Sequence, residues 1–89
     1  MPEATIEIIN KLGLHARAAT KFASTANRYA SDIRVSHAGK EIDGKSIMSL
    51  MLLAAAKGSV LTLKTDGCDA EEAMCALQEL INNRFDEGE

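Results

Sequence analysis

The sequence predicts a single α+β domain in which one antiparallel or mixed sheet is covered on a single face by helices. Its 89 residues suit one small domain (1–89), and a hydrophobic share of 46% is too high for a disordered chain. Four short segments alternate between apolar and polar residues, as half-buried strands do, and three segments repeat apolar residues every three or four positions, as amphipathic helices do. The resulting order is β-α-β-β-α-β-α.

In the first half of the chain, alternation predicts a strand over residues 5–9 with Ile6 and Ile8 on its buried face. Helical spacing of apolar residues follows over 16–30. Two further strands, at 32–37 and around 41–43, are joined by Ala38-Gly39 into a hairpin that turns Ile33 and Val35 inward.

In the second half, Ser46 at a cap position and Gly58 beyond the last apolar residue bracket a short helix over 47–56. Residues 60–65 alternate as a strand, with Leu61 and Leu63 on one face. The last helix runs down to Phe85 and opens with Asp69-Ala70-Glu71-Glu72, which has the form of a capping box.

Charge and composition exclude several classes of protein. The net charge of -3 argues against a nucleic-acid partner, although residues 1–64 carry +4 and residues 65–89 carry -7. The longest apolar run, 50–56, is too short to span a bilayer, no signal peptide is visible, and the expected location is the cytoplasm, with no membrane partner. Cys68 and Cys75 lack the spacing of a redox or zinc pair and are expected to be reduced, partly buried thiols.

The strongest candidate for chemistry is the run Gly13-Leu14-His15-Ala16-Arg17. Gly13 permits the backbone angles that turn a strand into a helix, and His15 then falls at or next to the N-cap. A helix N-terminus attracts anions and disfavours the charged form of a nearby histidine, so the neutral ring is a nucleophile. A phosphoryl group on His15 would face the backbone N–H groups of Ala16 and Arg17, with the Arg17 side chain free to pair with it.

Two interpretations of this run stay open. Between residues 10 and 30 the ionised side chains are Lys11, Arg17, Lys21 and Arg28, a local +4 that would attract an acidic partner surface. Alternatively, His15 is a weak N-cap or an ordinary surface histidine, and the cations are a solvated helix face. His37 closes a strand beside a turn and is expected to be a surface residue.

Ser46 is the second candidate. As an N-cap its hydroxyl would bind a backbone N–H of the next turn, which is a sufficient structural role. The same position also tolerates a phosphoserine, since anions are favoured at helix N-termini. Ile47, Met48 and Met51 follow it, and in so short a helix some of them must face water as an adaptable docking surface.

The sequence contains no motif for metal binding, hydrolysis or nucleotide binding. The histidines and cysteines lack metal-ligand spacing, so no metal is expected, and no cofactor is expected either. No G-x-S-x-G, G-x-G-x-x-G, Walker A or H-E-x-x-H pattern occurs.

Two motifs resemble those of the HPr family, the histidine phosphocarriers of the bacterial phosphoenolpyruvate phosphotransferase system. Residues 10–17, Asn-Lys-Leu-Gly-Leu-His-Ala-Arg, are similar to its active-site segment, and Gly44-Lys45-Ser46-Ile47-Met48, followed by residues 55–58, is similar to its regulatory-serine segment. The resemblance covers essentially the whole chain. It implies an open-faced β-sandwich whose four-stranded antiparallel sheet has the order 1-4-2-3.

The resemblance also implies roles and partners. His15 would be phosphorylated by Enzyme I, itself charged from phosphoenolpyruvate, and would pass the group to enzyme IIA domains as a covalent carrier rather than an enzyme. Arg17 would contact the phosphate, and Ser46 would be the target of an HPr kinase/phosphorylase and of regulatory proteins that recognise it. Lys21 and the apolar residues after Ser46 would contact partners, and a monomer is expected.

One departure concerns Ala18, because many members of the family have proline there, a residue that a first helical turn tolerates. Alanine favours helix, so function should survive. Two other functions stay open: a nitrogen-type regulatory member of the family, whose phosphorylation state is read by partner proteins, and a plain binding module in which His15 is incidental.

Overall fold

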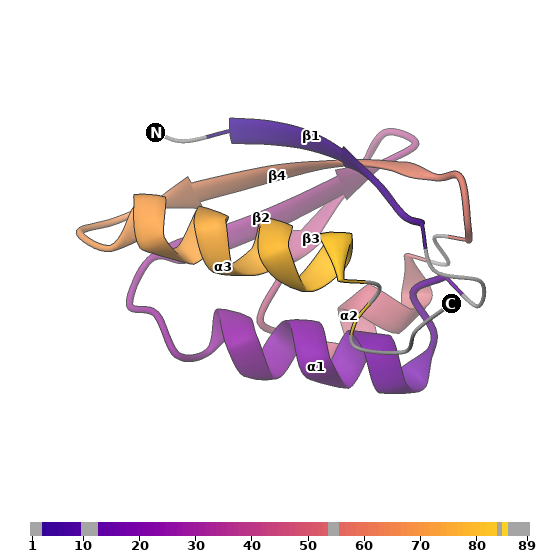
Figure 1. Ribbon diagram of the computed structural model, residues 1–89, viewed down its shortest axis with the longest axis horizontal. Coiled ribbons are helices and arrows are strands. Elements are labelled where there is room, and N and C mark those ends of the chain that lie inside the picture. Colours follow the sequence, from indigo (N-terminus) through magenta and orange to yellow (C-terminus); the bar gives the residue numbers. More distant parts are fainter. Residues whose placement is uncertain (1–2, 10–12, 54–55, 84, 86–89) are drawn as a thin grey trace.

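The computed structural model describes residues 3–9, 13–53, 56–83 and 85. Within them the chain forms four strands and three helices in the predicted order (Figure 1). The elements are β1 (Glu3–Glu7), α1 (Ala16–Ala26), β2 (Asp32–His37), β3 (Lys40–Asp43), α2 (Ile47–Leu52), β4 (Val60–Asp66) and α3 (Ala70–Asn82).

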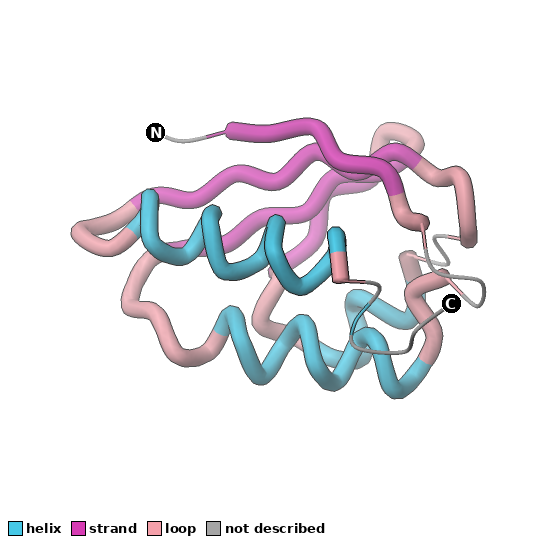
Figure 2. The backbone as a smooth tube through the Cα atoms, in the orientation of Figure 1, coloured by secondary structure: helices cyan, strands magenta, loops and turns pink. Residues whose placement is uncertain are grey.

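The strands form one antiparallel sheet in the order β1-β4-β2-β3, which confirms the expected topology. Figures 1 and 2 show the helices as a second layer on one side of this sheet, while its other side is uncovered. The hairpin between β2 and β3 turns as predicted, with positive φ angles at Ala38 and Gly39. The fold is therefore the open-faced α+β sandwich.

The core lies between the two layers and is almost entirely aliphatic. Apart from Ile6, the strand residues predicted to face inward are fully buried, as are two aromatic rings, Phe22 and Phe85. The buried face of α1 consists of Phe22 and four alanines, Ala18, Ala19, Ala23 and Ala26, and α1 packs against α2 and α3. Ile6 is only half-buried, whereas Ile8 is fully buried.

Several element bounds differ from the prediction. The last helix, α3, ends at Asn82 instead of running down to Phe85. β1 begins and ends two residues early, although Ile8 still exchanges hydrogen bonds of 2.9 and 2.8 Å with Ser59 and Gly58. α1 ends at Ala26, and Asn27 is its C-cap, with the side-chain Nδ2 donating to Ala23 O at 2.8 Å. The assigned helix α2 ends at Leu52, and residues 54–55 lie outside the described part of the chain.

The predicted capping box at Asp69 is wrong. Asp69 occupies the N-cap position of α3, but its carboxylate makes no bond to that helix. It accepts instead from the backbone N–H groups of Ala30 and Ser31, at 2.9 and 3.0 Å, and from the Ser31 hydroxyl. The Ser31 hydroxyl, and then the backbone N–H of Ala30, lower the pKa of Asp69 below its ordinary value of 3.8. Asp69 therefore ties the start of α3 to the loop after α1.

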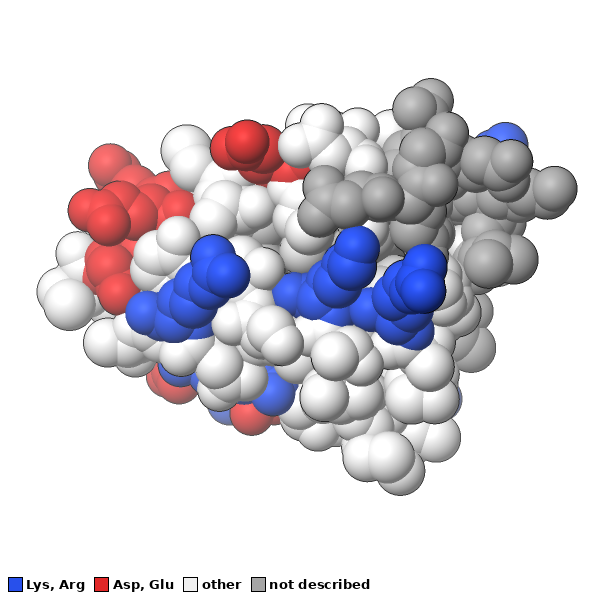
Figure 3. Space-filling model, turned by 60° about the horizontal axis from the view of Figure 1, so that its bottom comes forward, with Lys and Arg blue, Asp and Glu red and all other residues white. Residues whose placement is uncertain are grey.

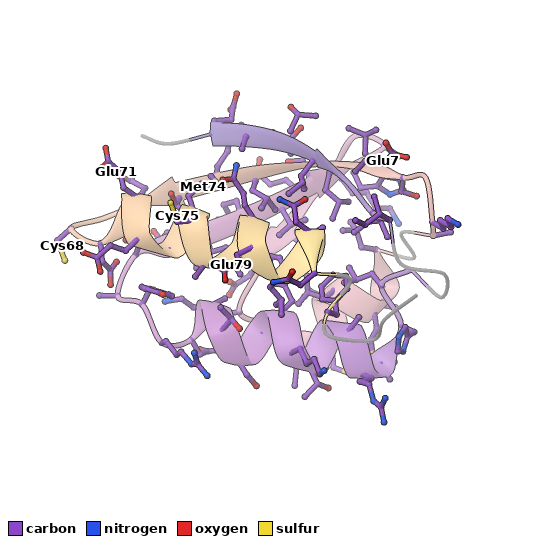
Figure 4. The ribbon with its side chains drawn as sticks, in the orientation of Figure 1. Glu7, Cys68, Glu71, Met74, Cys75 and Glu79 are labelled. Atoms are coloured by element: carbon purple, nitrogen blue, oxygen red, sulfur yellow. The ribbon has the colours of Figure 1, made fainter. Side chains whose placement is uncertain are left out.

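The two cysteines also differ from the prediction, since both are exposed rather than partly buried. Cys68 lies in the turn between β4 and α3, and Cys75 lies on the outer surface of α3 (Figure 4). Both are free thiols.

Candidate functional site

His15 is the N-cap of α1, as predicted. Its backbone is extended (φ -85°, ψ -176°), and its Nδ1 accepts a hydrogen bond from the backbone N–H of Arg17 at 3.3 Å. Gly13 makes the approach to the helix with φ +67°, and buried Leu14 anchors the chain beside the histidine. An accepting Nδ1 carries no proton, so in the neutral ring the proton is on Nε2 and the Nδ1 lone pair faces the helix N-terminus.

The first turn of α1 suits an anion on His15. It contains no acidic residue, and both Ala16 and Arg17 are exposed. The Arg17 guanidinium forms no ion pair with any described residue and can reach an incoming charge. Ala18 lies in this turn with its methyl group fully buried, so the position that often holds proline is filled here by a core residue.

Arg17 and Lys21 lie on α1 and Arg28 lies in the loop just after it, and we call these three residues the basic face. Figure 3 shows basic side chains in a row along the side of the molecule that α1 brings forward, with acidic side chains toward its left end. No acidic residue occurs in the segments 8–31 and 44–65, which contain α1 and α2. The helical layer therefore presents positive charge beside His15.

Lys21 has a role that the sequence did not predict. Its ammonium group is half-buried and donates to the backbone carbonyl of Phe85 at 2.7 Å. This bond joins α1 to the segment after α3, where Phe85 turns back into the core with φ +53°. Lys21 thus holds the fold together in addition to contributing charge to the basic face.

Ser46 is the N-cap of α2, also as predicted. Its Oγ accepts from the backbone N–H of Ser49 at 3.3 Å, and the side chain is half-buried. The hydroxyl therefore lies at the surface of the molecule, at the start of the second helix.

Four large apolar side chains of α2 are exposed, and we call them the apolar patch: Ile47 (40% exposed), Met48 (68%), Met51 (43%) and Leu52 (72%). The first, second and third were predicted to dock partners, whereas Leu52, the most exposed, was not. The sequence spacing could have predicted its exposure, since Leu52 follows Met48 by four residues and so lies on the same helix face. The helix that carries the apolar patch packs against α1, which carries Arg17 and Lys21 of the basic face.

The remaining candidates fall outside this region. His37 is half-buried at the end of β2, opposite Lys40, and has no link to His15. Residues 10–12 of the first motif, which include Lys11, and residue 55 of the second motif lie outside the described residues. Across the described ranges, no set of three or more histidine, cysteine or acidic side chains is arranged to hold a metal ion. None of the helices in these ranges has the length and apolar character needed to cross a bilayer.

Comparison with known proteins gives one consistent family. The family model described as the PTS HPr component phosphorylation site matches residues 2–83. The phosphocarrier protein HPr of Pseudomonas aeruginosa is 59% identical over 90 residues, which cover the whole of both chains. A crystal structure of HPr from Thermoanaerobacter tengcongensis is 47% identical, covers 98% of each chain and superimposes with a TM-score of 0.95. Another structure from that organism, described as an HPr dimer, is 47% identical, covers 96% of this chain and 98% of the other, and has a TM-score of 0.77.

The family model and the full-length relatives place this open-faced sandwich among the phosphocarrier proteins. The chain belongs to the HPr family of phosphocarrier proteins of the phosphotransferase system.

Proposed function

We propose that this protein relays a phosphoryl group, taking it from Enzyme I onto Nδ1 of His15 and passing it to enzyme IIA domains. The observation that carries this proposal is the hydrogen bond from the Arg17 backbone N–H to His15 Nδ1. It holds the ring with an unprotonated, nucleophilic nitrogen at the positive end of α1. Membership of the phosphocarrier family supports the same role.

The chemistry needs few groups. As the Nδ1 lone pair forms the bond to phosphorus, the bond from phosphorus to the Enzyme I donor breaks, and the ring proton stays on Nε2. The Arg17 N–H loses its acceptor at that moment and becomes free to donate to a phosphoryl oxygen. The exposed Arg17 guanidinium and the N–H of Ala16 can add charge-assisted bonds to the same group.

The site stabilises the phosphoryl group only modestly, as a relay requires. A helix N-terminus contributes about 0.3–1 kcal/mol to a nearby exposed anion. Within the first turn of α1, the cation is Arg17. A carrier that held the group much more tightly would release it slowly to the next protein.

Partner recognition is assigned to the surfaces next to His15. The basic face attracts acidic partner surfaces at long range, and the apolar patch supplies area that loses water on contact. Docking there would place a partner's reactive group against the N-cap of α1. The monomeric state and the cytoplasm remain the expected assembly and location.

Ser46 is the proposed regulatory site for an HPr kinase. Phosphate at this position would add about two negative charges beside the apolar patch and the neighbouring cations. Enzyme I attracted by the basic face would then bind more weakly, so Ser46→Asp should slow phosphorylation of His15. An unchanged rate in that variant would remove this part of the proposal.

A second function uses the same site. The protein would act as a regulatory HPr whose phosphorylation state is read by a transporter, a kinase or a transcription regulator. The apolar patch favours this function as well, because a docking surface of flexible Met side chains adapts to several partners. Phosphoryl transfer to an enzyme IIA domain separates the two functions.

The decisive experiment for the site is labelling with Enzyme I and labelled phosphoenolpyruvate. The wild type should take up an acid-labile, alkali-stable label, and His15→Ala should take up none. His37→Ala is the matched control, since it removes the other described histidine without touching α1, and it should be labelled like the wild type. Label that persists in His15→Ala would refute the assignment.

A further inference from the structure

The peptide that precedes Ser46 is tied to the C-terminal end of α1 by two side chains. Asn27, the C-cap of α1, donates from Nδ2 to the carbonyl of Lys45 at 3.1 Å and to that of Ala23 at 2.8 Å. Lys45 donates in turn from Nζ to the carbonyl of Tyr29 at 2.8 Å. His15 is therefore the N-cap of α1, and Asn27, the C-cap of the same helix, contacts the residue next to Ser46.

The same segment is fixed on its other side by the sheet. The backbone N–H of Gly44 donates to Ile33 O at 2.8 Å, and the N–H of Lys45 donates to the Asp43 carboxylate at 2.9 Å. A Cβ at Gly44 would lie 2.6 Å from Ile33 Cγ2, so only glycine allows this close approach. Its neighbour Lys45 is thereby held at the end of α1.

The helix that follows Ser46 cannot fix its position alone. α2 has only six residues, which is too short for a helix to be stable without outside contacts. The bond from Ser49 N–H to Ser46 Oγ is long at 3.3 Å. The orientation of the serine thus depends on the contacts of the segment before it.

We propose that Asn27 and Lys45 are positioning residues for the phosphorylation of Ser46. They act through the backbone of residues 44–46, which they hold in the conformation that presents the Ser46 hydroxyl. This inference rests on the Ser46 part of the proposed function. In the step itself the bond from Ser46 Oγ to phosphorus forms, the bond from the γ-phosphorus of ATP to ADP breaks, and the hydroxyl proton passes to a base on the kinase.

The proposal predicts a specific kinetic signature. If the segment is loosened, only a fraction of the molecules present Ser46 correctly, and the apparent affinity for the kinase falls by that fraction. Once bound, the serine reacts as before. KM for phosphorylation of Ser46 therefore rises while kcat stays unchanged.

The test compares Asn27→Asp with Asn83→Asp. The first variant keeps the size of the side chain but turns a carboxylate toward two carbonyl oxygens. The second makes the same charge change at the C-cap of α3, on an exposed side chain away from Ser46. With purified HPr kinase and ATP, Asn27→Asp should raise KM about tenfold at constant kcat, and Asn83→Asp should leave both unchanged.

A second variant and a second measurement keep the test independent of folding and of the kinase. Lys45→Met removes only the bond to Tyr29 and should raise KM about fivefold. In the unphosphorylated protein, amide exchange of Ser49 should speed up about tenfold in Asn27→Asp, while labelling of His15 by Enzyme I stays within twofold of the wild type.

The outcomes separate the two proposals. Unchanged KM and unchanged Ser49 exchange in Asn27→Asp would overturn the positioning role, as would an equal rise of KM in Asn83→Asp. If wild-type protein takes no phosphate at Ser46, the regulatory function fails, and the phosphorylation step proposed for Asn27 and Lys45 fails with it. Accelerated Ser49 exchange would then show only that the contacts order the segment.

Discussion

Phe85 should carry a large share of the stability of this protein, although it lies beyond the end of the last helix. Its ring is fully buried, and its carbonyl accepts the hydrogen bond from Lys21. Truncating a buried phenylalanine to alanine costs about 3–5 kcal/mol, because the lost apolar contacts are joined by a cavity. Phe85→Ala should therefore unfold far more easily than the wild type.

The loss expected for Phe85→Ala is large compared with the free energy of unfolding of the whole domain. A domain of 89 residues has a free energy of unfolding of roughly 4–13 kcal/mol, so the substitution removes a quarter or more of it. For a domain of this size, each kcal/mol lowers Tm by about 4–8 °C. A loss of about 3 kcal/mol thus corresponds to a decrease of about 12–24 °C.

The assay is thermal and urea unfolding followed by circular dichroism. Met48→Ala is the control, since it shortens a side chain that is 68% exposed and should change the free energy of unfolding by less than about 0.5 kcal/mol. Lys21→Met should fall between the two, at about 1 kcal/mol for one hydrogen bond. A decrease in Tm below about 4 °C for Phe85→Ala would refute the claim that this ring completes the core.

Three other perturbations test the contacts described above. Because the pKa of Asp69 is lower in the folded protein than its ordinary value of 3.8, the ionised carboxylate stabilises the folded state above pH 3.8. This stabilisation is lost as the pH falls through the folded-state pKa. Acid unfolding of Asp69→Asn should therefore depend less on pH in this range than that of the wild type. Ser46→Ala should lower the free energy of unfolding by about 1 kcal/mol through loss of the cap, and Ser46→Gly by only about 0.3 kcal/mol; equal losses would argue against a capping role. Arg28→Ala should slow association with Enzyme I at low salt, and the difference from the wild type should shrink near 1 M salt, where charges are screened within about 3 Å. A salt-independent difference would contradict a role in electrostatic attraction.

Much of the fold could be predicted because the apolar pattern has a different period in strands and in helices. The prediction of β2 is correct at both ends, since its alternation stops at the Ala38-Gly39 turn. The end of α1 could not be found in this way. Its apolar spacing continues to residue 30, but Asn27 closes the helix with contacts to Lys45, a residue distant in the sequence.

In the candidate site, too, local features could be predicted from the sequence and long-range contacts could not. The N-cap positions of His15 and Ser46 could be predicted, because glycine and polar residues before an apolar repeat are local signals. The contacts of Asp69 and Lys21 could not, because their partners are 38 and 64 residues away in the chain. Asp69 has the local form of a cap, and the loop after α1 competes successfully for its carboxylate.

The central claim is that phosphate on His15 is in transit to another protein. The most direct test is to isolate the protein labelled on His15, remove Enzyme I and phosphoenolpyruvate, and add a purified enzyme IIA domain from the same organism. The relay predicts that the label leaves this protein and appears on the IIA domain in stoichiometric amount. Label that stays on His15, or that is released only as inorganic phosphate, would contradict the relay.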